Sequence, residues 1–252
     1  TVSFLKLRAS YGLTGNNNIG NYTSISGMDV TNYVFGGALS PGKSITSLGN
    51  PDLGWETTKQ LDVGVDMGLF DDRIFINYDY YHKITDGMLY AIELPRASGF
   101  SSIQYNVGKF KFWGHEIGIS PRNLTAELKW NTDFNITFNR NNVIQLGTNN
   151  TPIGGIAEQG DYWRTVVGRP MGQFYGYVFD GVYMDRREFE SQPKHASSDV
   201  GTVRMKDING DGVIDINDRT FIGDPTPKFL FGLSNDFRYK NFDLNIVVSG
   251  SV

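Results

Sequence analysis

Oxygen-bearing side chains recur at regular spacing in the segment 207–218, which reads DINGDGVIDIND. They fall at positions 1, 3, 5, 9 and 12 of a twelve-residue stretch, and Gly212 stands at position 6. This spacing is typical of a calcium loop, in which a hard cation collects carboxylate and carbonyl oxygens around a tight turn. The position-7 residue would ligate through its backbone carbonyl and the others through side chains. The predicted ligands are Asp207, Asn209, Asp211, Val213, Asp215 and Asp218.

The same spacing is compatible with a turn rich in Asp and Gly that binds no metal. The closing residue Asp218 stands where a calcium loop of the EF-hand type carries Glu. Neither flank of the segment shows an amphipathic helix. We therefore expect calcium, where it binds, to act as a structural clamp in a chain of a different fold.

Six aromatic residues share a long irregular segment with the predicted calcium loop. Flat rings flanked by polar groups suit contact with the face of a sugar or with a partner protein. The alternative is that these rings pack the segment against itself, because so long a segment must bury apolar surface. The six candidates for a substrate or partner contact are Tyr162, Trp163, Phe174, Tyr175, Tyr177 and Tyr183.

Side chains for catalysis do not fall into a known pattern. The sequence has no nucleophile elbow, no phosphate-binding loop and no dinucleotide-type glycine pattern. His82, His115 and His195 are scattered, and His115-Glu116 lacks the second histidine of a helical zinc site. Paired carboxylates for glycoside hydrolysis cannot be judged from sequence, because their separation is a three-dimensional quantity. We predict that the protein is not an enzyme.

Composition narrows the class of protein further. The chain of 252 residues is 13% aromatic and contains 30 glycines and no cysteine, which favours many short strands and turns without disulfides. A net charge of -4 offers no basic stripe for nucleic acid. No run of 18 apolar residues is present, so no transmembrane helix is predicted.

Alternation of apolar and polar residues predicts seven strands. Short turns are expected at 70–72, 121–123 and 240–241, and long connections near 14–57, 85–110 and 140–227. The cleanest alternation sets Leu128 and Phe134 against Asn131 and Asp133. The strands are expected near 5–13, 61–69, 74–81, 111–120, 126–139, 229–239 and 242–248.

The strict alternation of short turns with long connections decides between two all-β architectures. A soluble β-sandwich shows turn signals about every 8–12 residues. An outer-membrane barrel has short periplasmic turns and long extracellular loops, and Phe70 and Tyr239 beside the short turns fit its aromatic girdle. We predict an antiparallel transmembrane β-barrel, with further strands outside this chain because bacterial single-chain barrels have an even number. The alternative is a secreted, calcium-stabilised β-sandwich that binds carbohydrate.

Several sequence blocks resemble the SusC/RagA family of TonB-dependent outer-membrane transporters of Bacteroidota. The most telling is GNPDLGWETTKQLDVGVD at 49–66, and the order and spacing of the blocks match across nearly all of 1–252. The resemblance implies that this chain forms later strands of a 22-stranded barrel. The plug domain and amino-terminal extension then lie outside it. The other blocks are 7–16, 167–177, 180–183 and 207–227.

The resemblance also implies a function that the residues by themselves do not. A SusD-like surface lipoprotein is expected to cap the barrel and deliver oligosaccharide, as in glycan uptake, or oligopeptide in the RagA branch. TonB, acting through the absent amino-terminal part, would open the lumen for nutrient uptake. The expected surroundings are outer-membrane lipids. The extracellular connection at about 140–227 is expected to contribute to the lid contact and to the solute path.

Overall fold

The structure, a computed structural model, describes residues 1–147, 149–154 and 162–252. The chain divides into two compact units, one formed by Thr1–Asn150 with Lys228–Val252 and the other by Thr151–Pro227. The first unit consists mainly of β-strands, whereas the second contains short strands and a helix of six residues, α1 (Arg186–Ser191). None of the helices in the described part of the chain is long and apolar enough to cross a membrane.

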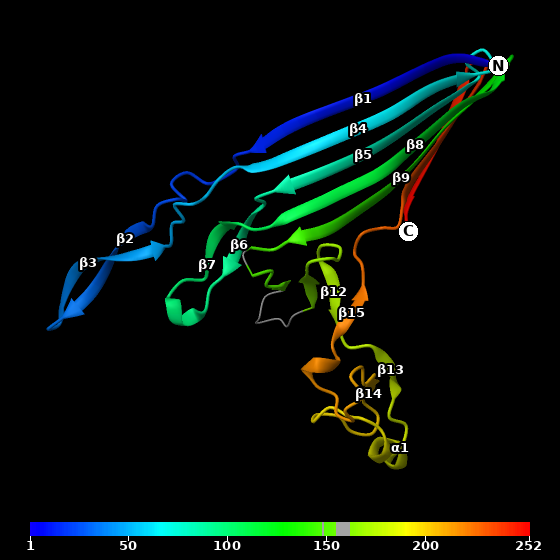
Figure 1. Cartoon of the computed structure of the whole chain (residues 1–252). Coiled ribbons are helices and arrows are strands. Elements are labelled where there is room, and N and C mark those ends of the chain that lie inside the picture. The colour runs from blue at the N-terminus through cyan, green and yellow to red at the C-terminus, as the bar shows by residue number, and fades with distance from the viewer. Residues whose placement is uncertain (148, 155–161) are drawn as a thin grey trace. The chain divides into compact units, whose positions relative to one another are not determined.

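The first unit contains a seven-stranded antiparallel sheet in the order β1-β4-β5-β8-β9-β16-β17, which forms the long ribbons lying side by side in Figure 1. The seven strands lie in the sheet in the same order as along the chain, and β1 and β17 form the two edges. The seven predicted strands are thus confirmed. Their bounds are β1 (Val2–Asn16), β4 (Glu56–Leu69), β5 (Ile74–Asp86), β8 (Lys109–Thr125), β9 (Leu128–Gln145), β16 (Leu230–Tyr239) and β17 (Phe242–Ser251).

Short turns join β4 to β5 and β16 to β17 at the predicted positions. Phe70, Asp71 and Asp72 have φ of 55°, 57° and 60°, and Lys240 has φ of 52°. The turn expected at 121–123 is wrong, since β8 continues to Thr125 and the turn falls at 126–127. A register shift between Arg122 and Leu124 absorbs the proline and asparagine that suggested a turn.

Two long connections fold into hairpins, which lie in Figure 1 beyond the end of the sheet opposite the short turns. The first pairs β2 (Gly27–Phe35) with β3 (Ala38–Ser47). The second pairs β6 (Leu89–Glu93) with β7 (Ser102–Asn106), with the 3-10 turn η1 (Arg96–Ser98) between them. These connections are therefore ordered elements and not irregular loops.

The second unit occupies most of the long connection expected at 140–227 and has a small core of its own. Tyr183 and Ile214 are 1% and 2% exposed. One sheet has the order β10-β11-β12-β15, and a second pairs β13 with β14. The bounds are β10 (Ile153–Gly154), β11 (Trp163–Thr165), β12 (Gln173–Gly176), β13 (Phe179–Val182), β14 (Val203–Met205), η2 (Ile216–Asp218) and β15 (Thr220–Gly223).

The register of the large sheet separates an apolar face from a polar one. One row crosses all seven strands with an apolar residue on each, and Leu5 and Val248 at its two ends remain 60% and 48% exposed. A sandwich would bury such a row against a second sheet, so the exposure disfavours the β-sandwich alternative. The apolar row is Leu5, Met67, Ile76, Ile119, Phe134, Leu233 and Val248. The neighbouring row, called the polar row, carries a polar side chain or glycine on each strand: Lys6, Asp66, Asn77, Gly118, Asn135, Gly232 and Ser249.

Candidate functional site

The polar face carries an ion-pair network that joins three strands. Arg8 of β1 donates from Nε and Nη2 to the Asp66 carboxylate of β4, at 2.9 and 2.8 Å. Nη2 also donates to Asp79 of β5 at 2.9 Å. A Cβ at Gly64 would lie 2.9 Å from Nη2 of Arg8 and would overlap the Asp79 carboxylate. Glycine therefore lets this network lie flat against the backbone.

A second glycine of the polar face is covered in the same way by an aromatic side chain. The Tyr81 ring lies over Gly114, where a Cβ would come within 2.6 Å of ring carbon Cε1. The Tyr81 hydroxyl then donates to Oδ1 of Asn139 at 2.7 Å. These side chains therefore lie along the strands of the polar face and do not project from it.

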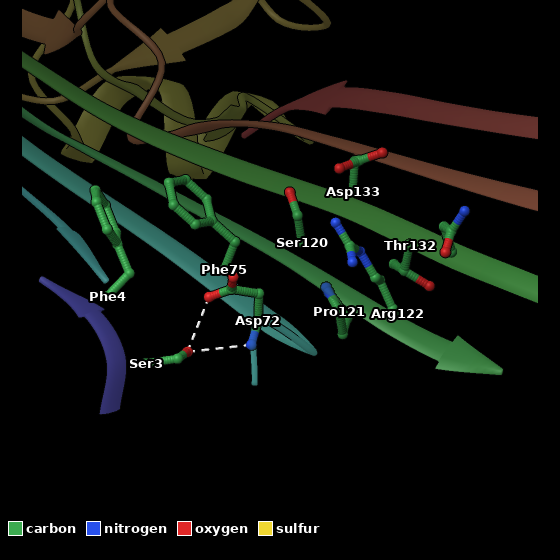
Figure 2. Close-up of a pocket in the computed structure, with 10 residues that line it drawn as sticks. Ser3, Phe4, Asp72, Phe75, Ser120, Pro121, Arg122, Thr132 and Asp133 are labelled. Carbon is green, nitrogen blue, oxygen red and sulfur yellow. Dashed lines mark hydrogen bonds between the residues drawn. The ribbon is translucent and has the colours of Figure 1, made fainter. Parts of the chain in front are cut away.

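A cleft of about 610 Å³ lies on the same face near the short turns. Figure 2 shows Phe4 and Phe75 side by side at one end, and below them the hydroxyl of Ser3 donates a hydrogen bond to the Asp72 carboxylate. The ring centroids of the two phenylalanines are 6.5 Å apart. The other end of the cleft is polar. It is lined by Ser120, Pro121, Arg122, Asn131, Thr132 and Asp133.

Two asparagines tie the long connections together at their base. Asn50, 4% exposed, donates from Nδ2 to the carbonyl of Gln104 at 2.9 Å. Asn106 accepts from the Gly54 amide at 2.7 Å and donates to the carbonyls of Gly54 and Gly87, both at 2.8 Å. Neither asparagine was predicted as a site residue, although Asn50 opens the NPD turn of the 49–66 block.

The predicted calcium loop closes on itself through hydrogen bonds to backbone amides. Both oxygens of Asp207 accept, from Gly210 at 2.6 Å and from Gly212 at 2.8 Å. Asp218, with 0% of its surface exposed, accepts from Ile208 and from Asp215, each at 2.8 Å. Hydrogen bonds from the backbone amides of Asp215, Ile208 and Asn209 hold the pKa of Asp218 below its ordinary value, and the bond from Asp215 has the largest effect. Burial of the carboxylate opposes this lowering.

The residue types of this loop fit calcium, but their side chains bind backbone amides of the loop and do not converge on one point. Asn209 and Asp211 accept from the amides of Asp211 and Val213, each at 2.9 Å, and Asp215 accepts from Asn217 at 2.7 Å. Each carboxylate retains free lone pairs for a cation. Among the described residues, however, no group of three or more His, Asp or Glu side chains converges on one point.

Five of the six predicted aromatic residues lie at or beside the four-stranded sheet. Trp163 of β11 stands opposite Phe174 of β12, and Phe174 is 48% exposed. Tyr162 is 66% exposed, and its backbone carbonyl accepts a hydrogen bond from the amide of Tyr175. Tyr177 directly follows β12.

The sixth aromatic residue is separate and buried. The hydroxyl of Tyr183 donates to the carbonyl of Pro193 at 2.5 Å, and its ring meets the Phe189 ring edge-on. Burial raises the pKa of Tyr183. The structure thus places Tyr183 in the core of the second unit and the other five nearer its surface.

Comparison with known proteins gives the class to which this architecture belongs. Residues 3–245 match the family described as TonB dependent receptor-like, beta-barrel. The chain is 38% identical to TonB-dependent receptor P3 of Formosa agariphila, over 100% of this chain and 26% of that protein. It is 28% identical to TonB-dependent receptor SusC of Bacteroides thetaiotaomicron, over 100% of this chain and 25% of that protein.

Solved structures give the same result. The RagAB peptide transporter superposes with a TM-score of 0.80 and 26% identity, over 98% of this chain and 26% of that chain. The RagAB peptide importer in its 'closed-closed' state gives 0.81 and 26%, over 100% and 27%. The chain belongs to the TonB-dependent receptor β-barrel family, of the SusC/RagA type, whose members are outer-membrane receptors and transporters and not enzymes. It spans about a quarter of the length of the relatives it matches.

Proposed function

We propose that the full-length protein to which this chain belongs, called the parent below, imports oligosaccharide or oligopeptide across the outer membrane. In this proposal the chain supplies part of the barrel wall and extracellular connections. The carrying observation is the pair of rows, one apolar and one polar, that cross all seven strands. A wall in contact with lipid on one side and with a hydrated lumen on the other requires this alternation.

The likeness to RagAB supports a two-component importer. Those structures are named for a peptide transporter, while SusC is named as a TonB-dependent receptor. We assign a SusD-like lipoprotein as the lid and TonB as the partner that acts on the part of the protein outside this chain. The hairpins β2–β3 and β6–β7 and the second unit would face the lid on the extracellular side, because short turns are periplasmic in such barrels.

Co-purification from the native outer membrane tests this proposal. The tagged full-length parent is extracted in detergent, and the proteins that accompany it are identified and quantified. We expect one lipoprotein in roughly equal amount. A parent recovered from the soluble fraction, or recovered from the membrane without a lipoprotein, contradicts the two-component importer.

We also propose calcium as a structural cofactor of the loop 207–218. The carboxylates would turn from the backbone amides toward a shared cation, which would clamp the loop. Replacing Asp207 and Asp211 together by Ala should abolish calcium binding and make this loop more sensitive to protease. A loop whose cleavage rate is the same with calcium and with chelator in the unaltered parent would exclude the clamp.

A further inference from the structure

Charged side chains on the apolar face of the large sheet are confined to the end beside the long connections. Cross-strand partners lie on the same face of a sheet, so the register assigns each strand residue to one face. The structure describes all seven strands of this sheet in full. From the short turns up to the row that contains Leu61 and Trp113, the part of the apolar face on β1, β4, β5 and β8 carries no Asp, Glu, Lys or Arg. The charged residues of this face are Lys59, Asp86, Lys109, Lys111 and Arg140.

Four of these five side chains are cations, and most of their charge is not neutralised within the chain. Lys109 lies 3.4 Å from the Asp86 carboxylate. Among the described residues, Lys59, Lys111 and Arg140 form no ion pair. Nη1 of Arg140 donates to two backbone carbonyls, at 2.7 and 3.0 Å, which orient the guanidinium but leave its charge unbalanced. The apolar face therefore ends in a group of three cations.

These three cations lie at the height where the lipid boundary of a barrel is expected. Lys59 is ten residues from Leu69, the last residue of β4. At about 3.4 Å per residue and a strand tilt of about 35–45°, that separation corresponds to a height of about 25 Å. The apolar band of an outer-membrane barrel has about the same height. Lys59 and its neighbours therefore stand where hydrocarbon gives way to lipid head groups.

An aromatic ring supports one of the cations at this boundary. Nζ of Lys111 lies 4.8 Å from the ring centroid of Trp113, which is one row nearer the apolar band. Tryptophan favours a membrane interface because one end of its ring system is apolar and the other carries an N–H donor. The stem of a lysine can cover such a ring while its ammonium group, with three donors, points to the polar side. Arg140 stands opposite Trp113 on β9.

The spacing of the cations suits an anion placed between them. Lys59 and Lys111 belong to one row, with Ile84 between them, so their Cα atoms are about 10 Å apart. This separation is about one Debye length at 0.1 M salt, and their repulsion is therefore only partly screened. Arg140 is on the strand next to Lys111 and one row nearer the apolar band. An anion that contacts these flexible side chains would relieve the repulsion.

We propose that Lys59, Lys111 and Arg140 bind the phosphate groups of a lipid head group in the outer leaflet of the membrane. The ammonium and guanidinium groups would donate charge-assisted hydrogen bonds to the phosphate oxygens. The acyl chains of the same lipid would lie against the apolar face. This inference rests on the proposed function, because it requires the apolar face to contact lipid and the long connections to be extracellular. It adds a specific lipid contact that fixes the height of the barrel wall in the membrane.

Lipid binding to the purified, delipidated full-length parent in detergent tests the site. The probes are lipid A with its phosphates and the same lipid after their removal, and native mass spectrometry counts the bound lipid during each titration. The unaltered parent should bind the phosphorylated form at least about fivefold more tightly. Lys111→Gln should weaken that binding about fivefold, and Lys59→Gln combined with Lys111→Gln about 25-fold. Inorganic phosphate at the same concentration should not displace the lipid, because it lacks acyl chains.

Lys83 provides a matched control on the opposite face. Its Nζ lies 4.7 Å from the ring centroid of Phe112, its partner on β8, at nearly the same height as Lys111. Lys83→Gln therefore removes the same charge and the same kind of ring contact, and should leave lipid binding unchanged. Lys111→Arg keeps the charge and should retain binding. The heat-dependent shift in electrophoretic mobility verifies that each variant is folded.

The proposal fails if the unaltered parent binds both forms of lipid A equally, or if inorganic phosphate displaces the lipid. It also fails if Lys83→Gln weakens binding as much as Lys111→Gln. In each of these cases a lipoprotein that co-purifies from the outer membrane would leave the importer function standing. A parent recovered from the soluble fraction would contradict the proposed function itself, and the lipid contact with it.

Discussion

Glycine on the polar face of the large sheet makes room for the side chains that cross it. At Gly114 a Cβ would lie 2.6 Å from the backbone carbonyl oxygen of Phe138 as well as from the Tyr81 ring. A ring can move, but the carbonyl belongs to the neighbouring strand and cannot. At Gly54, in the connection before β4, nothing lies within 4 Å of the corresponding position. The two glycines therefore differ in what a methyl group would disturb.

Gly114→Ala should destabilise the barrel of the full-length parent by roughly 1–3 kcal/mol, because it overpacks the space between strands. Gly54→Ala is the control and should have little effect. Heat-induced unfolding, followed as the shift in electrophoretic mobility between folded and unfolded barrel, measures the difference. Equal melting of the two variants would contradict the crowding at Gly114.

Tyr183 offers a test of the core of the second unit. Tyr183→Phe should cost about 1 kcal/mol, because the carbonyl of Pro193 loses its donor. Burial raises the pKa of the folded phenol, so its contribution to stability is complete below the ordinary pKa of about 10 and is lost as the pH rises through the folded value. A tyrosinate absorbance titration of the parent minus that of the variant should therefore show one late-titrating group. A difference that titrates near pH 10 would contradict the burial.

At the scale of elements, the hairpins of the long connections depend on polar ties more than on apolar contacts. Met28, Val30 and Ile45 on the β2–β3 hairpin are 63%, 64% and 50% exposed. A two-stranded hairpin is marginally stable by itself. The bonds of Asn106 to Gly54 and Gly87 therefore matter, because they join the base of this connection to the β6–β7 hairpin.

Asn106→Ala should loosen both connections. Three hydrogen bonds are lost, each worth about 0.5–1.5 kcal/mol, so the open form should become at least about tenfold more populated. Limited proteolysis of the folded parent tracks that population. Asn32→Ala, an exposed position on β2, is the control and should leave cleavage of the segment 17–55 unchanged. Cleavage that rises equally in both variants would show that the tie has no special role.

The sequence predicted the strands better than the connections, and the reason is physical. Alternation reports directly on a wall with two different faces, as Phe134 and Asn135 show. The turn expected at Pro121 failed because a bulge absorbs a proline and an asparagine without ending the strand. Arg164 and Gln173 could not be paired from sequence, because the contact depends on the register of β11 and β12.

At the scale of the whole molecule, the alternating wall has meaning only in a lipid bilayer. Phe134 lies in the apolar row between Ile119 and Leu233, in the part of β9 nearer the short turn. Asn131, three residues earlier, lines the polar cleft. In a barrel the first position faces lipid and the second faces the hydrated lumen.

Phe134→Arg should cost about 2–4 kcal/mol, because it places a charge in the hydrocarbon layer, whereas Asn131→Arg should be mild. The readout is the yield of folded full-length parent in the outer membrane, since a soluble sandwich would not reach that membrane with either side chain. Total synthesis of each variant serves as the control for expression. If Asn131→Arg reduces the membrane yield as strongly as Phe134→Arg, the two faces are not lipid and lumen, and the transporter wall inferred from the rows must be abandoned.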